Sequence, residues 1–196
     1  MRRRSLVVMV LLGCTLVASY ARGGNGLLKV GDRPPPLEFK PYKSQELVDW
    51  SGLKNRVVVV EFWATWCAPC IENIPHINDL VRKFALQPVT FISVTYETEG
   101  MVGRFLKEHP LSAMIGLDND FAMFRSFKAW GIPMAVIVNR KGRIACVLHP
   151  DNLSESVIDE VLAGKAPRVE PARPWPDPKG AEQYFRSLVK KAGPDK

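Results

Sequence analysis

Two cysteines separated by two residues are the side chains in this sequence best suited to covalent chemistry. Cys67 and Cys70 lie in the segment 62–70, FWATWCAPC. Such a pair can contribute to a zinc site or cycle between a dithiol and a disulfide. A structural zinc site usually takes four cysteine or histidine ligands, and this chain offers no second pair with matching spacing. The pair therefore indicates redox chemistry without a metal ion.

The segments around the pair explain how one thiol becomes reactive. Residues 57–63 are apolar except for Glu61 and rich in β-branched side chains, which predicts a buried strand. From Cys67 to about Leu86, apolar residues recur at helical spacing. The first cysteine then lies at the positive end of a helix, where unpaired backbone N–H groups favour the thiolate. Cys67 is thus the predicted nucleophile and Cys70, one turn inside the helix, the resolving thiol.

Further segments predict an α/β domain with one central sheet. Strands are expected at residues 89–94, 114–117, 134–138 and 143–148, and helices at 100–109, 120–127 and 153–162. The helix at 120–127 is expected to be capped by Asp118 or Asp120. The resulting order begins with a βαβ unit and ends with ββα, so helices should flank the sheet.

Segment 62–70 resembles the FWAxWCxPC active site of the thioredoxin superfamily, and within it the extracytoplasmic TlpA/ResA-like thiol–disulfide oxidoreductases. Residues 130–133, WGIP, are similar to the loop that carries the family's cis-proline. The resemblance covers about residues 29–164. It implies a thioredoxin-like fold, with a central mixed β-sheet flanked by helices and a TlpA-type central αβ insertion at residues 96–117.

The same resemblance suggests roles for individual side chains. Pro133 would lie beside the cysteines, and the backbone of Ile132 would pair with a bound substrate strand. Trp66 would shield the cysteines and offer a flat apolar contact. Glu61 stands where thioredoxins carry a buried Asp, and a carboxyl group in an apolar strand should have a raised pKa. It is therefore expected to accept the proton of Cys70 during resolution.

The chain departs from the family's pattern on the helix that follows the cysteines. TlpA/ResA-like proteins often carry Glu three residues after the second cysteine, whereas this chain has Asn73 there. Glu72 lies one residue early and points about 100° around the helix from that position. The family's role is therefore not transferred to Glu72. Cys146, in a predicted strand, is expected to be buried.

The resemblance implies a thiol–disulfide oxidoreductase that acts on exported proteins and is re-reduced by an upstream redox partner protein. No flavin, haem or metal cofactor is implied. Ala68 and Pro69, between the cysteines, supply no charge that would strongly stabilise a thiolate, which favours a reductant.

Two alternatives remain open at this point. A peroxiredoxin-like thiol peroxidase is suggested by residues 31–37, although the Pro-x-x-x-Thr/Ser-x-x-Cys loop of such enzymes is absent. The second alternative is a non-enzymatic module with a thioredoxin-like fold that binds or senses a partner.

The net charge of +7 comes from the ends of the chain. Residues 22–164 hold 16 basic and 16 acidic side chains, so a nucleic-acid partner is not expected. Residues 1–21 combine three arginines, an apolar run and Ser-Tyr-Ala, which predicts a signal peptide. A lipoprotein leader ending at Gly13, with lipidation at Cys14, is the alternative.

Either leader predicts an extracytoplasmic protein of the periplasm or cell envelope, with membrane anchoring through the leader as one outcome. Residues 165–196 form a proline-rich basic C-terminal tail.

Overall fold

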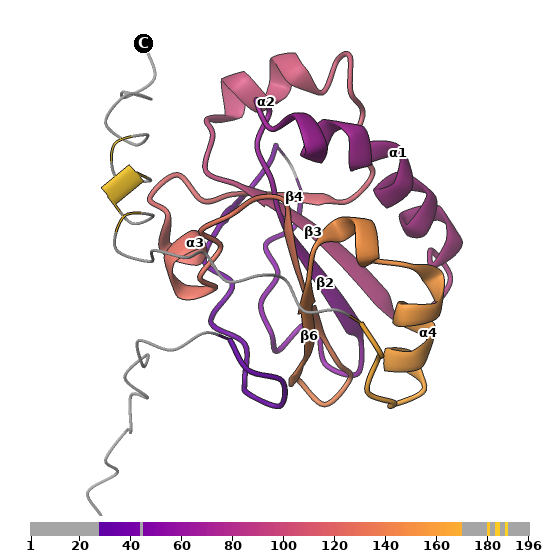
Figure 1. The fold of residues 1–196 in the computed structure, drawn as a ribbon. Helices are drawn as coiled ribbons and strands as arrows, with labels where there is room; N and C mark the ends of the chain where they lie inside the picture. Colours follow the sequence, from indigo (N-terminus) through magenta and orange to yellow (C-terminus); the bar gives the residue numbers. More distant parts are fainter. Residues whose placement is uncertain (1–27, 44, 170–179, 181–182, 185–186, 188–196) are drawn as a thin grey trace, which may run out of the picture.

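A six-stranded mixed sheet forms the centre of the computed structural model (Figure 1). The structure describes residues 28–43, 45–169, 180, 183–184 and 187, so the expected leader and most of the tail lie outside the described residues. Among the described residues, no helix has the length and apolar character needed to cross a membrane.

The strand order is β1-β4-β3-β2-β5-β6. Strands β2, β3 and β4 are parallel, whereas β1 pairs antiparallel with β4, and β5 pairs antiparallel with both β2 and β6. The strands are β1 (Lys40–Pro41), β2 (Val57–Phe62), β3 (Val89–Thr95), β4 (Met114–Leu117), β5 (Met134–Val138) and β6 (Ile144–Leu148). This arrangement confirms the predicted thioredoxin-like fold with a mixed sheet. Strand β1 is an addition to the elements expected from the sequence.

Helices cover both faces of the sheet, with α1 and α4 on one side and α3 on the other (Figure 1). They are α1 (Ala68–Lys83), α2 (Glu99–Phe105), α3 (Ala122–Ser126) and α4 (Glu155–Leu162). Successive side chains of β2 point to opposite faces of the sheet and so divide the hydrophobic core into two parts. Val57 and Val59 pack with α1 and α4, whereas Val58 and Val60 pack with α3. Helix α2 and strand β4 lie within residues 96–117, where the central αβ insertion was expected.

Helix α3 begins later than expected because of its N-terminal backbone. Phe121, the N-cap residue, adopts a left-handed conformation with φ 61°, and its side chain has no oxygen that could accept a backbone N–H group. The buried Asp118 carboxylate replaces that cap by accepting the backbone N–H groups of Met123 at 3.1 Å and Phe124 at 2.8 Å. Burial raises the pKa of Asp118 to about 7. The prediction that Asp118 or Asp120 is the N-cap residue is therefore wrong in position, since the N-cap is Phe121. Both carboxyl groups nevertheless accept N–H groups of the first turn, Asp120 that of Ala122.

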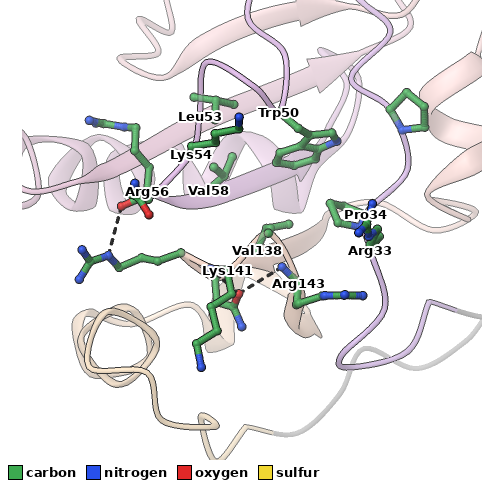
Figure 2. A pocket seen from close by; sticks show the side chains of 15 residues that line it. Arg33, Pro34, Trp50, Leu53, Lys54, Arg56, Val58, Val138, Lys141 and Arg143 are labelled. Atoms are coloured by element: carbon green, nitrogen blue, oxygen red, sulfur yellow. Dashed lines mark hydrogen bonds between the residues drawn. The ribbon is translucent and has the colours of Figure 1, made fainter.

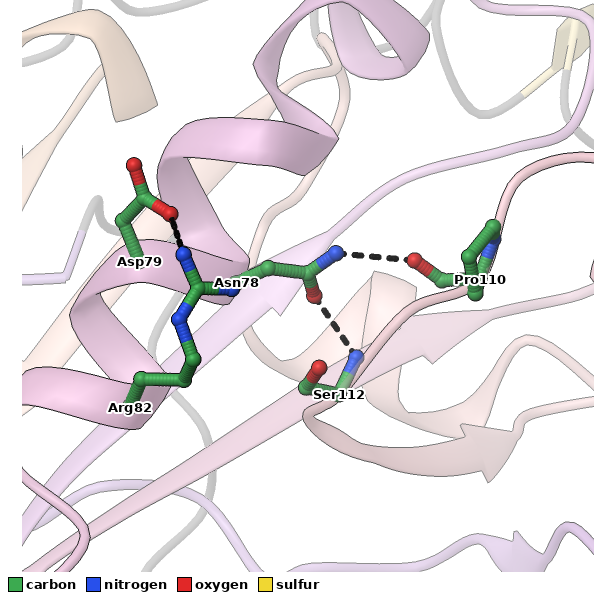
Figure 3. Close-up of polar contacts among 5 residues, drawn as sticks. All are labelled: Asn78, Asp79, Arg82, Pro110 and Ser112. Atoms are coloured by element: carbon green, nitrogen blue, oxygen red, sulfur yellow. Dashed lines mark hydrogen bonds and ion pairs between the residues drawn. The ribbon is translucent and has the colours of Figure 1, made fainter.

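The loop between α2 and β4 is held against helix α1 by one side chain (Figure 3). The amide nitrogen of Asn78 donates to the carbonyl of Pro110 at 2.8 Å, and its oxygen accepts the N–H of Ser112 at 2.7 Å. The adjacent Asp79–Arg82 ion pair is exposed and contributes little. The insertion is therefore attached directly to the helix that carries the cysteines.

Candidate redox site

Cys67 and Cys70 lie at the start of α1, as predicted, and are joined by a disulfide. Cys67 is the N-cap residue, with extended backbone angles, and its Sγ accepts the N–H of Cys70 at 3.3 Å. The first turn of α1 contains no acidic side chain, so the helix itself places no negative charge beside the cysteines. Both cysteines are almost fully buried, whereas Trp66, Ala68 and Pro69 are exposed. The Sγ of Cys67 therefore lies at the N-terminal, positive end of α1, as expected from the sequence.

The peptide bond between Ile132 and Pro133 is cis, in agreement with the family resemblance. The next residue, Met134, pairs with Phe62 at the end of β2 that leads into the cysteines. Met134 belongs to the same core cluster as the two cysteines, and Ile132 packs against that cluster. The structure therefore brings the cis-proline loop and the disulfide to one end of the sheet.

Glu61 is a buried carboxyl group on the central strand β2, one residue before the end of the strand that leads to the cysteines. It pairs with Ser93 of β3 and Ala135 of β5, and the Ser93 hydroxyl donates to its Oε2 at 2.9 Å. Burial raises the pKa of Glu61 to about 7, against a smaller lowering by the Ser93 hydrogen bond. Glu61 alternates with Val57 and Val59 and so shares the sheet face that packs against α1. A carboxyl group with this pKa can gain or lose a proton near neutral pH.

A second buried carboxyl group, that of Glu97, holds the segment just before Cys67. Its Oε2 accepts the N–H of Thr65 and its Oε1 accepts the Thr65 hydroxyl, both at 2.7 Å. The Thr95 hydroxyl also donates to Oε2 at 3.2 Å, and Asn119 donates to the Glu97 carbonyl at 2.9 Å. Sequence reasoning missed this residue. Glu97 could have been found from its position just after β3. Because β2 and β3 are parallel neighbours, the segments that follow them lie at the same edge of the sheet, which brings Glu97 close to Thr65.

Tyr96 fixes the exposed tryptophan beside the cysteines and was also missed. Its hydroxyl accepts the indole N–H of Trp66 at 2.7 Å, and its ring stacks on Phe121 with centroids 4.5 Å apart. Burial raises the pKa of Tyr96 to about 12, so the phenol stays protonated. Trp66 remains 52% exposed, and its expected role as a flat apolar contact stays a prediction.

Asn73 lies one helical turn beyond Cys70 and is buried. Its amide nitrogen has no hydrogen-bond partner among the described residues. Glu72 is exposed, so it is Asn73 that occupies the buried position where the family often carries glutamate. Cys146 is buried, as expected, and forms no disulfide, and burial raises the pKa of its thiol to about 12.

Comparison with known proteins agrees with this geometry. The chain is 27% identical over 147 residues to the thiol–disulfide oxidoreductase ResA of Oceanobacillus iheyensis, covering 72% of this chain and 77% of that protein. It is 27% identical over 159 residues to ResA of Bacillus subtilis, covering 80% and 87%.

Among solved structures, the thioredoxin domain of a thiol–disulfide oxidoreductase from Bacteroides vulgatus superposes with a TM-score of 0.61. It has 22% identity and covers 68% of this chain and 99% of that one. The model of the redoxin family matches residues 29–162. With this match over most of its length and a disulfide at the start of α1, the chain belongs to the redoxin family.

Proposed function

We propose that this protein is a thiol–disulfide oxidoreductase that reduces disulfides in exported proteins. The observation that carries the proposal is the Cys67–Cys70 disulfide at the N-terminus of α1, at the same end of the sheet as the cis-Pro133 loop. The names of the ResA relatives support the same activity and give no support to the peroxidase alternative.

The reaction begins with the reduced protein. The Cys67 thiolate attacks one sulfur of a substrate disulfide, forming a mixed disulfide and releasing the other substrate sulfur as a thiolate. Cys70 then attacks Sγ of Cys67, which forms the intramolecular disulfide and releases the second substrate sulfur. The substrate gains two electrons and this protein loses two. A dithiol partner protein must return those electrons before the next cycle.

Glu61 is proposed to accept the proton that Cys70 loses when it attacks. Its pKa of about 7 and its place on the sheet face that packs against α1 support this role. Ile132 is proposed to pair its backbone with an extended substrate segment, and Trp66 to cover that segment's apolar side chains. The absence of charge on Ala68 and Pro69 supports a reductant rather than a strong oxidant.

The site is proposed to act outside the cytoplasm. The leader expected at residues 1–21 would export a thioredoxin-like domain at residues 29–164, followed by the basic tail at 165–196. Cleavage of that leader would release the domain, whereas lipidation at Cys14 would keep it at the membrane.

A trapping experiment tests the proposal. The Cys70→Ala variant, expressed with its own leader, should accumulate mixed disulfides through Cys67 because resolution is blocked. Mass spectrometry of these adducts identifies the substrates. Cys70→Ala combined with Cys67→Ser should trap nothing, and Cys70→Ala combined with Cys146→Ser should trap the same partners.

Failure of Cys70→Ala to trap any protein would contradict the proposal. Rapid peroxide consumption by the reduced wild-type protein would instead favour the thiol peroxidase. Retention of biological function in Cys67→Ser would favour the non-enzymatic module.

A further inference from the structure

A cavity of about 550 Å³ lies beside the start of β2, at the end of the sheet opposite the cysteines. Figure 2 shows the side chains that line it. Its floor includes Val58 and Val138, which pair across β2 and β5. Phe62, which leads into the redox site, is four residues farther along β2, or about 13 Å at the usual rise of a strand. The cavity is therefore separate from the thiol chemistry.

The cavity combines a rim of positive charge with an apolar floor. Its lining includes six basic side chains and no acidic one, and none of the six forms an ion pair with another described residue. The basic residues are Arg33, Lys54, Arg56, Arg140, Lys141 and Arg143. Buried Leu53 and Val58 and half-buried Trp50 supply apolar surface between them. This combination suits a ligand that carries both negative charge and an apolar group.

Hydrogen bonds hold the walls of the cavity in place without a ligand. Nε of Arg140 donates to the carbonyl of Asn55 at 3.1 Å and so links the β5–β6 turn to the segment before β2. The side-chain oxygen of Asn139 accepts the N–H groups of Lys141 and Arg143, which fixes the turn itself. Walls that are ordered beforehand reduce the entropy that a ligand must overcome on binding.

Two lining side chains are themselves held in one orientation. Arg56 donates from Nε to the Thr90 hydroxyl and from Nη2 to the Val89 carbonyl, both at 2.7 Å. The guanidinium group has further N–H donors that these two bonds leave available. The Trp50 indole donates to the Pro35 carbonyl at 2.6 Å, which fixes its ring. The cavity thus offers a fixed cation and a fixed aromatic ring.

We infer that this cavity binds an organic phosphate, with the phosphate among the basic side chains and an apolar group against Trp50 and Leu53. Guanidinium groups match phosphate oxygens in charge and geometry, and several cations together favour a multiply charged anion. The volume suits a small molecule. A soluble phosphate ester and the headgroup of an acidic phospholipid share this chemistry.

Calorimetric titration of the full chain with phenyl phosphate and inorganic phosphate tests the inference. Phenyl phosphate should bind at least about tenfold more tightly, because only it fills the apolar floor. The Lys141→Gln/Arg143→Gln variant should weaken that binding about tenfold or more. The Arg104→Gln/Lys107→Gln variant removes the same two charges from exposed positions on and just after α2 and should leave binding within about twofold.

The Trp50→Phe variant examines the apolar contact: it should retain inorganic phosphate binding and reduce the preference for phenyl phosphate.

Co-sedimentation with phosphatidylglycerol vesicles, compared with phosphatidylcholine vesicles, distinguishes a lipid headgroup from a soluble phosphate ester as the ligand. Binding to phosphatidylglycerol alone, lost in Lys141→Gln/Arg143→Gln, supports the lipid headgroup as the source. Equal losses of phenyl phosphate affinity in the two double variants would overturn the inference. So would the absence of both a preference for phenyl phosphate over inorganic phosphate and any binding to phosphatidylglycerol vesicles. Disulfide-reductase activity should be unchanged in both double variants.

Discussion

The two ends of the central sheet differ in how they use charge. At the end that carries the cysteines, the carboxyl groups of Glu61 and Glu97 are buried and each accepts hydrogen bonds from neighbouring strands or loops. At the opposite end, six basic side chains surround an apolar cavity without ion pairs among the described residues. Buried charge can shift a pKa and position a reacting group, whereas exposed charge attracts a ligand. The balanced charge of residues 22–164 therefore hides an uneven distribution.

The largest expected effect is the loss of the nucleophile at the cysteine end. Cys67→Ser should lower reductase activity toward a disulfide-bonded test protein by about 10³-fold or more, because a hydroxyl cannot form the mixed disulfide. Cys146→Ser, which alters a buried thiol with a raised pKa, should retain that activity. Comparable losses in both variants would mean that the chemistry is not confined to this end.

Glu61→Gln tests whether the buried carboxyl group titrates. The folded-state pKa of about 7 exceeds the unfolded value near 4.5, so folding stability falls as pH rises through this range. Glutamine at position 61 carries no titratable group, so the variant does not lose folding stability in this way as pH rises. The variant should match the wild type at pH 4 and be more stable by about 3 kcal/mol at pH 8 in urea unfolding. Asp118 titrates in both proteins, so its contribution cancels.

The same substitution should slow attack by Cys70 on a preformed mixed disulfide about 100-fold at pH 7 and remove a rate-determining pKa near 7. Glu72→Gln, at an exposed position on α1, is the matched control and should change neither rate nor stability. An unaltered pH profile in Glu61→Gln would exclude the proton-accepting role.

Glu97→Gln examines the carboxylate that positions the segment before Cys67. Both carboxylate oxygens accept hydrogen bonds from Thr65, and an amide can replace only one of them, so unfolding stability should fall by about 2 kcal/mol. Alkylation of reduced Cys67 should also slow. Glu99→Gln removes an exposed ion pair with Lys40 and should cost less than about 1 kcal/mol. Equal changes in the two variants would show that Glu97 has no special role.

The smallest expected effect comes from Tyr96→Phe, which removes one hydrogen bond to Trp66. A loss of about 1 kcal/mol in stability and a changed Trp66 fluorescence emission are expected. Tyr42→Phe is the control, because Tyr42 packs in a separate cluster with Val102 and Ile115 and its substitution should alter Trp66 emission little. Identical spectra in Tyr96→Phe and the wild type would mean that Trp66 is positioned by other contacts.

The elements that carry the cysteines could be predicted because their patterns are local. The apolar run before Cys67 and the helical periodicity after it identify the junction of β2 and α1. The cis-proline loop required a family resemblance, since spacing alone does not determine a cis bond. Glu61 stood out because a single acid interrupts an apolar strand.

The remaining features depend on contacts between distant segments. Glu97 meets Thr65 across 32 residues, and this contact follows from the register of β2 and β3 rather than from a local pattern. Strand β1 has only two residues, too few for a period of two to be seen. The basic cavity is assembled from residues 33–36, 50–58 and 138–143, so its charge does not appear as a run in the sequence.

The most direct test of the central claim is which cysteine of the reduced protein reacts first. Iodoacetamide at pH 6–7, followed by mass spectrometry of the peptides, measures the alkylation rate of each thiol. The position of Cys67 as the N-cap of α1 predicts that it reacts many times faster than Cys70. Equal rates, or faster reaction of Cys70, would contradict the assignment of Cys67 as the nucleophile.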